Sequence, residues 1–243
     1  MKITAIIPAR YTSSRFLGKP LALINGKPLI QHTLERIKKC KKIDFITVVT
    51  DNKLIYNFVK KLNFKIFMTK KNCKSGTDRI AFAASKYLKN CDLFINVQCD
   101  EPLIDPKLVD TLVDLLKKNK SLECATAAFP IYDKDVIENP NVVKVVFNKY
   151  RYALYFSRYA IPYNRDNIKT QYYKHIGVYG YRREFLIQFS RTKMLCLEKT
   201  ENLEQLRILE TGKKIKVIIS KYDSIGVDTP DDIINVEKYL SKY

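Results

Sequence analysis

The sequence predicts an α/β fold in which a mostly parallel sheet is flanked by helices. The first half alternates short β-rich runs with helical segments, and this βαβα order is typical of a parallel sheet covered on both faces. Three tyrosine-rich strands with short polar connections follow, and they predict a smaller antiparallel β extension at about residues 140–185. No repeat, low-complexity stretch or linker divides the chain, so we expect one domain over residues 1–243.

In the first half, the apolar runs at 3–7, 45–49, 65–68 and 93–97 are predicted strands. Helices are expected between them at 28–39, 53–62 and 77–88, and Asp105-Pro106 opens another that extends to about residue 118. Pro28 suits a position in the first turn of its helix. Because ligands of such sheets bind beyond the carboxyl ends of the strands, the loops that follow these strands are the first candidates for a site.

The second half contributes the three tyrosine-rich strands at 142–147, 152–156 and 176–181. Residues 203–210 are expected to be helical, with Gly212 as a left-handed cap at the end of the helix. A late strand is predicted at 216–220, and Pro230 begins a final helix that extends through Leu240.

The chain is strongly basic, with 44 Lys and Arg against 25 Asp and Glu and a net charge of +19. The lysines are scattered in pairs, several near the ends of predicted helices, and there is no basic tail, zinc-finger spacing or aromatic RNA-binding motif. This distribution favours solvated surfaces and attraction for anionic substrates over specific nucleic-acid binding. A basic nucleic-acid-binding protein without catalysis remains the rival class, and weak salt-sensitive binding would fit either.

Six dispersed cysteines, with no C-x-x-C pair, predict neither a disulfide framework nor a zinc site, and they fit a reducing cytoplasm. No run of 18 apolar residues exists, so no membrane span is expected. The apolar N-terminus is too short for a signal peptide and is followed at once by Pro8, Arg10 and Arg15, so we interpret it as the first strand.

The segment 8–21, directly after the first strand, combines two arginines, a lysine, three hydroxyl side chains and a glycine. A triphosphate needs such cations, together with backbone donors where glycine allows close approach. The spacing of a Walker loop or a dinucleotide fingerprint occurs nowhere in the chain. From these residues alone, phosphate binding and a plain basic surface loop are equally supported.

An ordered series of motifs extends this pattern nearly to the end of the chain, at 6–10, 13–15, 18–21, 25–28, 75–79, 96–102, 152–158, 175–181, 203–207 and 226–232. The series resembles the sugar nucleotidyltransferases, and in particular the 3-deoxy-manno-octulosonate (Kdo) cytidylyltransferase family. The resemblance implies a nucleotidyltransferase-like fold that transfers CMP from CTP to an eight-carbon acid sugar and releases pyrophosphate. It also implies Mg²⁺ as cofactor, a homodimer, and a product used in lipopolysaccharide assembly.

The resemblance assigns Mg²⁺ to Asp100, which follows the strand at 93–97, and to Asp228, which precedes the last helix. Magnesium takes one or two protein carboxylates together with substrate phosphates. Without the resemblance, Asp100 would be a strand-end turn residue and Asp228 a helix cap. A carboxylate pair beside a triphosphate loop would repel phosphate unless a cation is present, which separates this hypothesis from nucleic-acid binding.

Further roles follow from the same resemblance. Charge on the phosphates would be stabilised by Arg10, Arg15 and Lys19 during in-line attack of the sugar's anomeric hydroxyl on the α-phosphorus. The residues expected around CTP are Pro8, Ala9, Arg10, Lys19, Ser75, Gly76, Thr77 and Arg79. The residues expected around the sugar are Gln98, Arg158, His175, Tyr179, Glu204 and Gln205.

Several of these residues have plain structural alternatives. Thr77 could cap the helix that follows it, Glu204 and Gln205 could be exposed helix residues, Tyr179 could fill a strand, and His175 could be a satisfied structural histidine. His32 is assigned that structural role.

Two departures from the family pattern are Cys99, where glycine is usual, and Leu17, where proline is usual. An 8-amino analogue of the sugar, or sialic acid, is the nearest alternative substrate.

Overall fold

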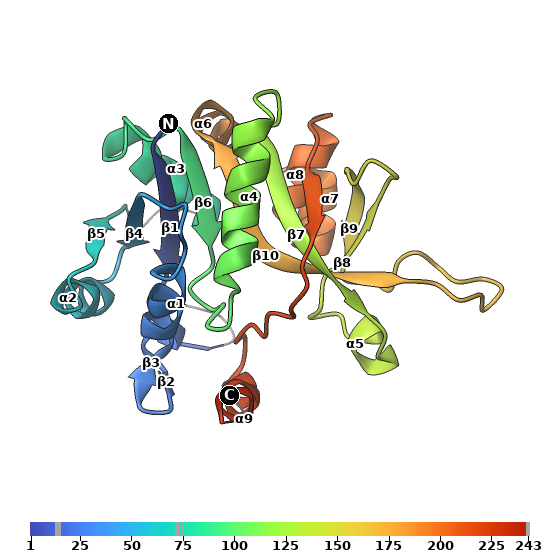
Figure 1. The fold of residues 1–243 in the computed structure, drawn as a ribbon, viewed down its shortest axis with the longest axis horizontal. Helices are drawn as coiled ribbons and strands as arrows, with labels where there is room; N and C mark the ends of the chain where they lie inside the picture. Colours follow the sequence, from blue (N-terminus) through green and yellow to red (C-terminus); the bar gives the residue numbers. More distant parts are fainter. Residues whose placement is uncertain (13–15, 71–72, 74, 242–243) are drawn as a thin grey trace.

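The computed structural model describes residues 1–12, 16–70, 73 and 75–241. Its main sheet has nine strands within this part of the chain. Seven of them follow the order β11-β7-β10-β6-β1-β4-β5, and the other two form an antiparallel extension (Figure 1). Strands β1, β4, β5 and β6 run parallel to one another, whereas β10 is antiparallel to both β6 and β7. The strands are β1 (Ile3–Ala9), β4 (Phe45–Thr50), β5 (Lys65–Met68), β6 (Leu93–Val97), β7 (Cys124–Ile131), β10 (Tyr172–Arg182) and β11 (Lys216–Ile219).

Helices cover both faces of this sheet. The first face packs against α1 (Leu29–Ile37), α2 (Lys53–Lys61) and α4 (Pro106–Lys118), which share one apolar core with it. The opposite face packs against α3 (Gly76–Lys86), α6 (Arg183–Arg191), α7 (Cys196–Glu201) and α8 (Gln205–Glu210) around a second core. The mostly parallel sheet with helices on both faces is the architecture that the sequence predicts.

The antiparallel extension consists of β8 (Lys144–Phe147) and β9 (Ala153–Ser157), which pair with each other, and β8 also pairs with the long strand β10. Lys144 lies wholly buried inside it, and its ammonium donates to the carbonyl oxygens of Asn139, Val142 and Arg158 at 2.5–2.8 Å. Burial lowers the pKa of Lys144, and three carbonyl acceptors compensate for the lost water. The lysine therefore joins the strands of the extension from within.

The last helix of the chain lies beside a hairpin that follows β1 by about a dozen residues. This short hairpin, β2 (Leu23–Ile24) and β3 (Lys27–Pro28), lies next to the last helix, α9 (Pro230–Leu240) (Figure 1). A third apolar cluster joins them through Ile24, Leu29, Leu103, Val227 and Val236. Because Val227 is buried in this cluster, the residue that follows it, Asp228, is held near the loop after β1.

The predicted strands and helices of the first half are confirmed, with shifts of a few residues at their ends. Pro28 precedes α1 as its N-terminal flanking residue and does not lie in its first turn. Gly212 has a φ of 74°, as the left-handed cap requires. The sequence prediction missed β7, the short helix α5 (Lys134–Glu138), α6 and α7.

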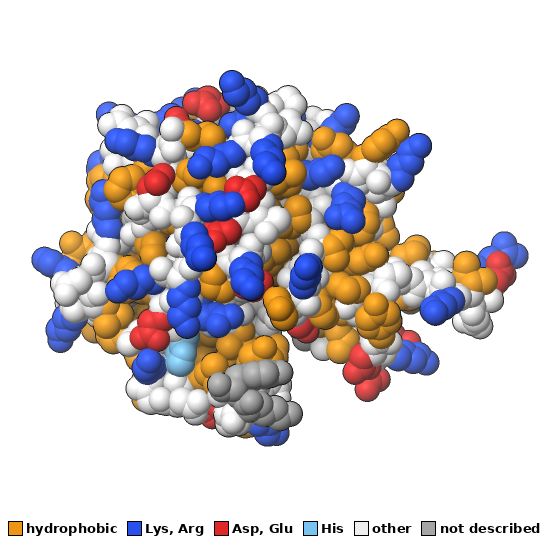
Figure 2. All heavy atoms as spheres, viewed as in Figure 1, with side chains coloured by type: hydrophobic (Ala, Val, Ile, Leu, Met, Phe, Trp, Pro, Cys, Tyr) orange, Lys and Arg blue, Asp and Glu red, His pale blue; other side chains and the backbone are white. Residues whose placement is uncertain are grey.

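No helix among the described residues is long and apolar enough to cross a bilayer. Lys and Arg side chains are spread over the visible face and are interspersed with acidic and apolar groups (Figure 2). On this face the positive charge is therefore dispersed, as the scattered lysine pairs predict.

Candidate active site

The carboxyl ends of β1 and β6 border a cavity of about 400 Å³. It opens where ligands of parallel sheets bind. Its walls are formed by Pro8, Arg10, Thr12, Lys19, Gly76, Gln98, Cys99 and Asp100. The structure therefore brings together residues that the sequence assigned to CTP, to the sugar and to the metal. Ala9 is the buried last residue of β1, and Arg15 lies outside the described residues.

Lys19 joins the two candidate metal ligands. Its ammonium forms ion pairs with Asp100 and with Asp228, the latter at 3.2 Å, and donates to the carbonyl oxygen of Val227 at 2.9 Å. Burial disfavours the charged lysine, but Asp100 and Asp228 outweigh this effect and raise the pKa of Lys19. Two acids 128 positions apart in sequence therefore share one cation.

The backbone before Lys19 explains its position. Gly18 has a φ of 72°, and its amide donates to the carbonyl oxygen of Tyr11 at 2.8 Å, which closes the loop after β1. This left-handed conformation favours glycine. A short 3-10 helix, Lys19–Leu21, then directs the lysine into the cavity. Leu17, which replaces a usual proline, is 67% exposed and does not line the cavity.

The surroundings of Asp100 and Asp228 fit a magnesium ion. The Lys19 ammonium already lies among three oxygen atoms, from Asp100, Asp228 and the carbonyl group of Val227, so these oxygens can stabilise a positive charge. Oxygen is the ligand type that Mg²⁺ prefers, and substrate phosphates and water complete its shell. Among the described residues, no group of three or more Asp, Glu, His or Cys side chains is placed to hold a metal ion. The alternative role of Asp228 as a helix cap is wrong, because Thr229 occupies that position and pairs with Asp232.

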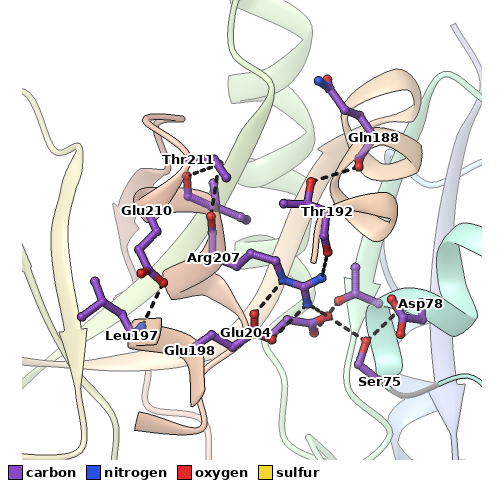
Figure 3. Close-up of polar contacts among 12 residues, drawn as sticks. Ser75, Asp78, Gln188, Thr192, Leu197, Glu198, Glu204, Arg207, Glu210 and Thr211 are labelled. Atoms are coloured by element: carbon purple, nitrogen blue, oxygen red, sulfur yellow. Dashed lines mark hydrogen bonds and ion pairs between the residues drawn. The ribbon is translucent and has the colours of Figure 1, made fainter. Parts of the chain in front are cut away.

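Glu204 connects the predicted nucleotide and sugar groups (Figure 3). Its carboxylate accepts from the hydroxyls of Ser75, at 2.7 Å, and Thr77, at 2.8 Å, and Arg207 forms an ion pair with it at 3.1 Å. Burial raises the pKa of Glu204, and the two hydroxyls and Arg207 oppose the rise. Ser75 caps α3 by accepting from the amide of Asp78, so the alternative role of Thr77 as cap is wrong. Glu204 is likewise not an exposed helix residue, because its side chain is only 28% exposed and accepts from both hydroxyls.

Two other predicted residues are enclosed by protein. Arg79 is fully buried; its guanidinium forms an ion pair with Asp51 at 2.8 Å and donates to Thr69. Arg79 therefore joins α3 to the residues that follow β4 and β5. Gln205 is 8% exposed at the start of α8, beside Glu204.

The remaining predicted sugar residues lie on the second half of the chain. His175 packs its ring against Phe156 and Tyr179, and its Nε2 atom lies 3.0 Å from the hydroxyl of Thr126. Burial lowers the pKa of His175 to about 3, so its imidazole is neutral at physiological pH. Tyr179 is 7% exposed, and burial raises its pKa well above the ordinary value. Arg158 donates to the carbonyl oxygens of Glu201 and Pro140.

Cys99 occupies its position without backbone strain, because its φ is not positive. Its carbonyl oxygen accepts from the hydroxyl of Thr33 at 3.0 Å, and burial raises the pKa of its thiol to about 12. The thiol is therefore a neutral filler of the cavity wall. His32 lies at the hydrogen-bond distance of 2.9 Å from the carbonyl oxygen of Ile24, in agreement with its structural assignment.

Sequence reasoning gave no role to three charged residues near these sites. Arg207 and Glu198 form a buried ion pair behind Glu204, and Glu101 accepts from Ser224 next to Asp100. Burial raises the pKa of Glu101 to about 7. Arg207 and Glu101 lie within the motifs at 203–207 and 96–102, but their partners lie outside these motifs and are brought close only by the fold.

An open α/β sheet with a cation-rich cavity at its strand ends places the protein in the class that binds ligands at this edge. A family model described as cytidylyltransferase matches residues 4–215. This match covers most of the chain, and the chain belongs to the cytidylyltransferase family.

Individual relatives agree over the full length. A 3-deoxy-manno-octulosonate cytidylyltransferase of Fusobacterium nucleatum is 45% identical over 242 residues, which are 100% of this chain and 98% of the relative. An 8-amino-3,8-dideoxy-manno-octulosonate cytidylyltransferase of Shewanella baltica is 48% identical over 243 residues, 99% of each protein. A solved CMP:2-keto-3-deoxy-manno-octonic acid synthetase complexed with CTP has a TM-score of 0.93 at 38% identity, over 100% of this chain and 99% of the other. These findings confirm the resemblance and the fold class.

Proposed function

We propose that the protein transfers CMP from CTP to 3-deoxy-manno-octulosonate and releases pyrophosphate. The observation that carries the proposal is the cavity at the ends of β1 and β6, where Arg10 and Lys19 lie beside Asp100. Full-length similarity to a synthetase complexed with CTP supports the same assignment. The cavity offers what the reaction needs, which is positive charge for a triphosphate and carboxylates for a divalent cation.

In this mechanism the residues of the cavity bind and orient the substrates. Arg10 and Lys19 neutralise the phosphates, and Lys19 must exchange its carboxylate partners for a phosphate to do so. Asp100 and Asp228 would then hold Mg²⁺, which supplies positive charge that favours ionisation of the attacking hydroxyl. The anomeric hydroxyl attacks the α-phosphorus in line, its proton is lost to solvent, and pyrophosphate leaves. Gln98, Arg158, His175, Tyr179, Glu204 and Gln205 are the proposed sugar contacts.

The proposal extends to assembly, compartment and pathway. Aromatic side chains are exposed on the second half, among them Tyr132, Tyr159 and Tyr163 at 77–82% exposure, and they offer a surface that a second copy would cover in a homodimer. The six free thiols fit the cytoplasm. The product would serve lipopolysaccharide assembly.

The 8-amino analogue is the second candidate substrate, because relatives that carry the two names are 45% and 48% identical to this chain. A pyrophosphate-release assay with CTP and Mg²⁺ against a panel of acid sugars separates them. We expect release with 3-deoxy-manno-octulosonate, and a much faster reaction with the 8-amino sugar would reassign the substrate. If no nucleotide–sugar pair releases pyrophosphate while oligonucleotides bind tightly at physiological salt, the proposal fails and the nucleic-acid class replaces it.

A further inference from the structure

The hydrogen-bonded cluster around Glu204 joins two parts of the chain that are far apart in sequence. Ser75 and Thr77 belong to the start of α3, and Glu204 immediately precedes α8. Each oxygen of the Glu204 carboxylate accepts from one of the two hydroxyls, so the carboxylate holds the starts of both helices together (Figure 3).

Arg207 holds this carboxylate from the other side. Its Nη2 atom lies 3.1 Å from Glu204, while Nε and Nη2 contact the two oxygens of Glu198 at 2.7 and 3.0 Å. Nη1 donates to the carbonyl oxygen of Thr192 at 2.8 Å, and the guanidinium lies 4.6 Å from the centre of the Phe189 ring. The side chains of Arg207 and Glu198 are only 6% and 5% exposed. A guanidinium held on every side has a fixed direction, which it imposes on Glu204.

Glu204 keeps acceptor capacity for a ligand. An ionised carboxylate has about four acceptor positions. Three donors occupy it here, from Ser75, Thr77 and Arg207, and 28% of its side chain is exposed. A sugar hydroxyl can therefore bind Glu204 without displacing the bonds that order Ser75 and Thr77. The carboxylate would then take part in both substrate sites at once.

We propose that Arg207 is a positioning residue that couples the two substrates, because it holds Glu204 against Ser75 and Thr77 so that each bound substrate strengthens binding of the other. The inference rests on the proposed function. A sugar that fixes Glu204 also fixes the hydroxyls beside the nucleotide, so the second ligand has less to order. By linkage, the nucleotide strengthens sugar binding by the same factor.

Equilibrium titrations test the coupling without turnover. The nucleotide is a CTP analogue with a methylene group in place of the oxygen between the α- and β-phosphorus, and its dissociation constant is measured by calorimetry with and without saturating 3-deoxy-manno-octulosonate. We expect the sugar to tighten nucleotide binding about fivefold or more in the wild-type protein. The coupling is expressed as the ratio of the nucleotide dissociation constant without the sugar to that with the sugar. In Arg207→Met this ratio should approach one. Arg207→Lys should restore part of the coupling, because lysine returns the positive charge without the planar guanidinium.

Arg182→Met is the matched control, since the Arg182 guanidinium is likewise held by three residues, through the carbonyl oxygens of Leu116, Asn119 and Leu122, on a part of the fold away from Glu204. It should keep the wild-type ratio. If Arg207→Met does not fold, Thr77→Val removes one hydroxyl of the cluster and leaves Arg207 in place, and the ratio should also fall there. A wild-type ratio of one, or an unchanged ratio in both variants, overturns the coupling. If the wild-type protein binds neither the CTP analogue nor the sugar, the proposed function itself is overturned.

Discussion

Two acidic clusters each hold one cation, and they differ in how firmly they hold it. Asp100 and Asp228, with side chains 26% and 41% exposed, hold the ammonium of Lys19 at the edge of the cavity. Glu198 and Glu204 hold the guanidinium of Arg207, and its pair with Glu198 is almost fully buried. A lysine is a point charge on a flexible stem, whereas an arginine is a planar fork that matches carboxylates in a fixed geometry. We therefore expect the Lys19 cluster to exchange its cation and the Arg207 cluster to keep its cation permanently.

The largest expected effect concerns the permanent cluster. Glu198→Ala removes the buried carboxylate that pairs with Arg207, and loss of one partner of a buried pair destabilises a protein by about 3–5 kcal/mol. Urea unfolding should show a loss of this size. The matched control is Glu123→Ala, whose pair with Lys213 is 39–40% exposed and should cost less than about 1 kcal/mol. Equal losses in the two variants would remove the distinction between the clusters.

The exchangeable cluster should instead matter to turnover. Asp100→Ala and Asp228→Ala should each lower turnover by about a hundredfold or more, because charge stabilisation by a metal is worth several kcal/mol. Steady-state pyrophosphate release measures the effect. Asp114→Ala is the control, since Asp114 lies on α4, pairs with Lys42 and does not line the cavity. Near-normal turnover in both cavity variants would defeat the proposed mechanism.

The effect of burial on a titrating group appears at His175 as a dependence of stability on pH. Its pKa is about 3 in the folded protein and about 6.5 when unfolded, so below pH 6.5 only the unfolded chain takes up the proton. Stability is therefore complete above pH 6.5 and is lost as the pH falls toward 3. Between pH 7 and pH 5 the wild-type protein should lose up to about 2 kcal/mol more than His175→Gln, by urea unfolding. Parallel losses in the two proteins would mean that His175 is not buried as a neutral ring.

Strand order predicted the positions of Asp100 and Lys19 in the open cluster, whereas nothing in the sequence predicted the burial of Arg207. Parallel strands end at one edge, so the position of Asp100 after a buried strand predicted its place, and the loop that holds Lys19 follows β1 directly. Asp228 needed the resemblance, since only the third apolar cluster brings α9 to that edge. For Arg207 the sequence shows a polar helix residue, because its partners Glu198 and Thr192 lie on separate segments whose packing decides its burial. The strand β7 was missed for a related reason: its alanine-rich sequence has weak β propensity and depends on burial between β10 and β11.

The sharpest test of an exchangeable cation is to remove it. In Lys19→Met the two carboxylates lose the cation that they share, and their mutual repulsion should favour any divalent ion that enters. We expect the variant to bind Mn²⁺, used in place of Mg²⁺, about tenfold more tightly than the wild-type protein when no nucleotide is present. Electron paramagnetic resonance of free Mn²⁺ measures this, and Lys27→Met, which removes an exposed partner of Glu35, should leave the affinity unchanged. Equal Mn²⁺ affinities in Lys19→Met and wild type would show that Lys19 does not compete with the metal, and the lysine would then belong with Arg207 among the permanent partners.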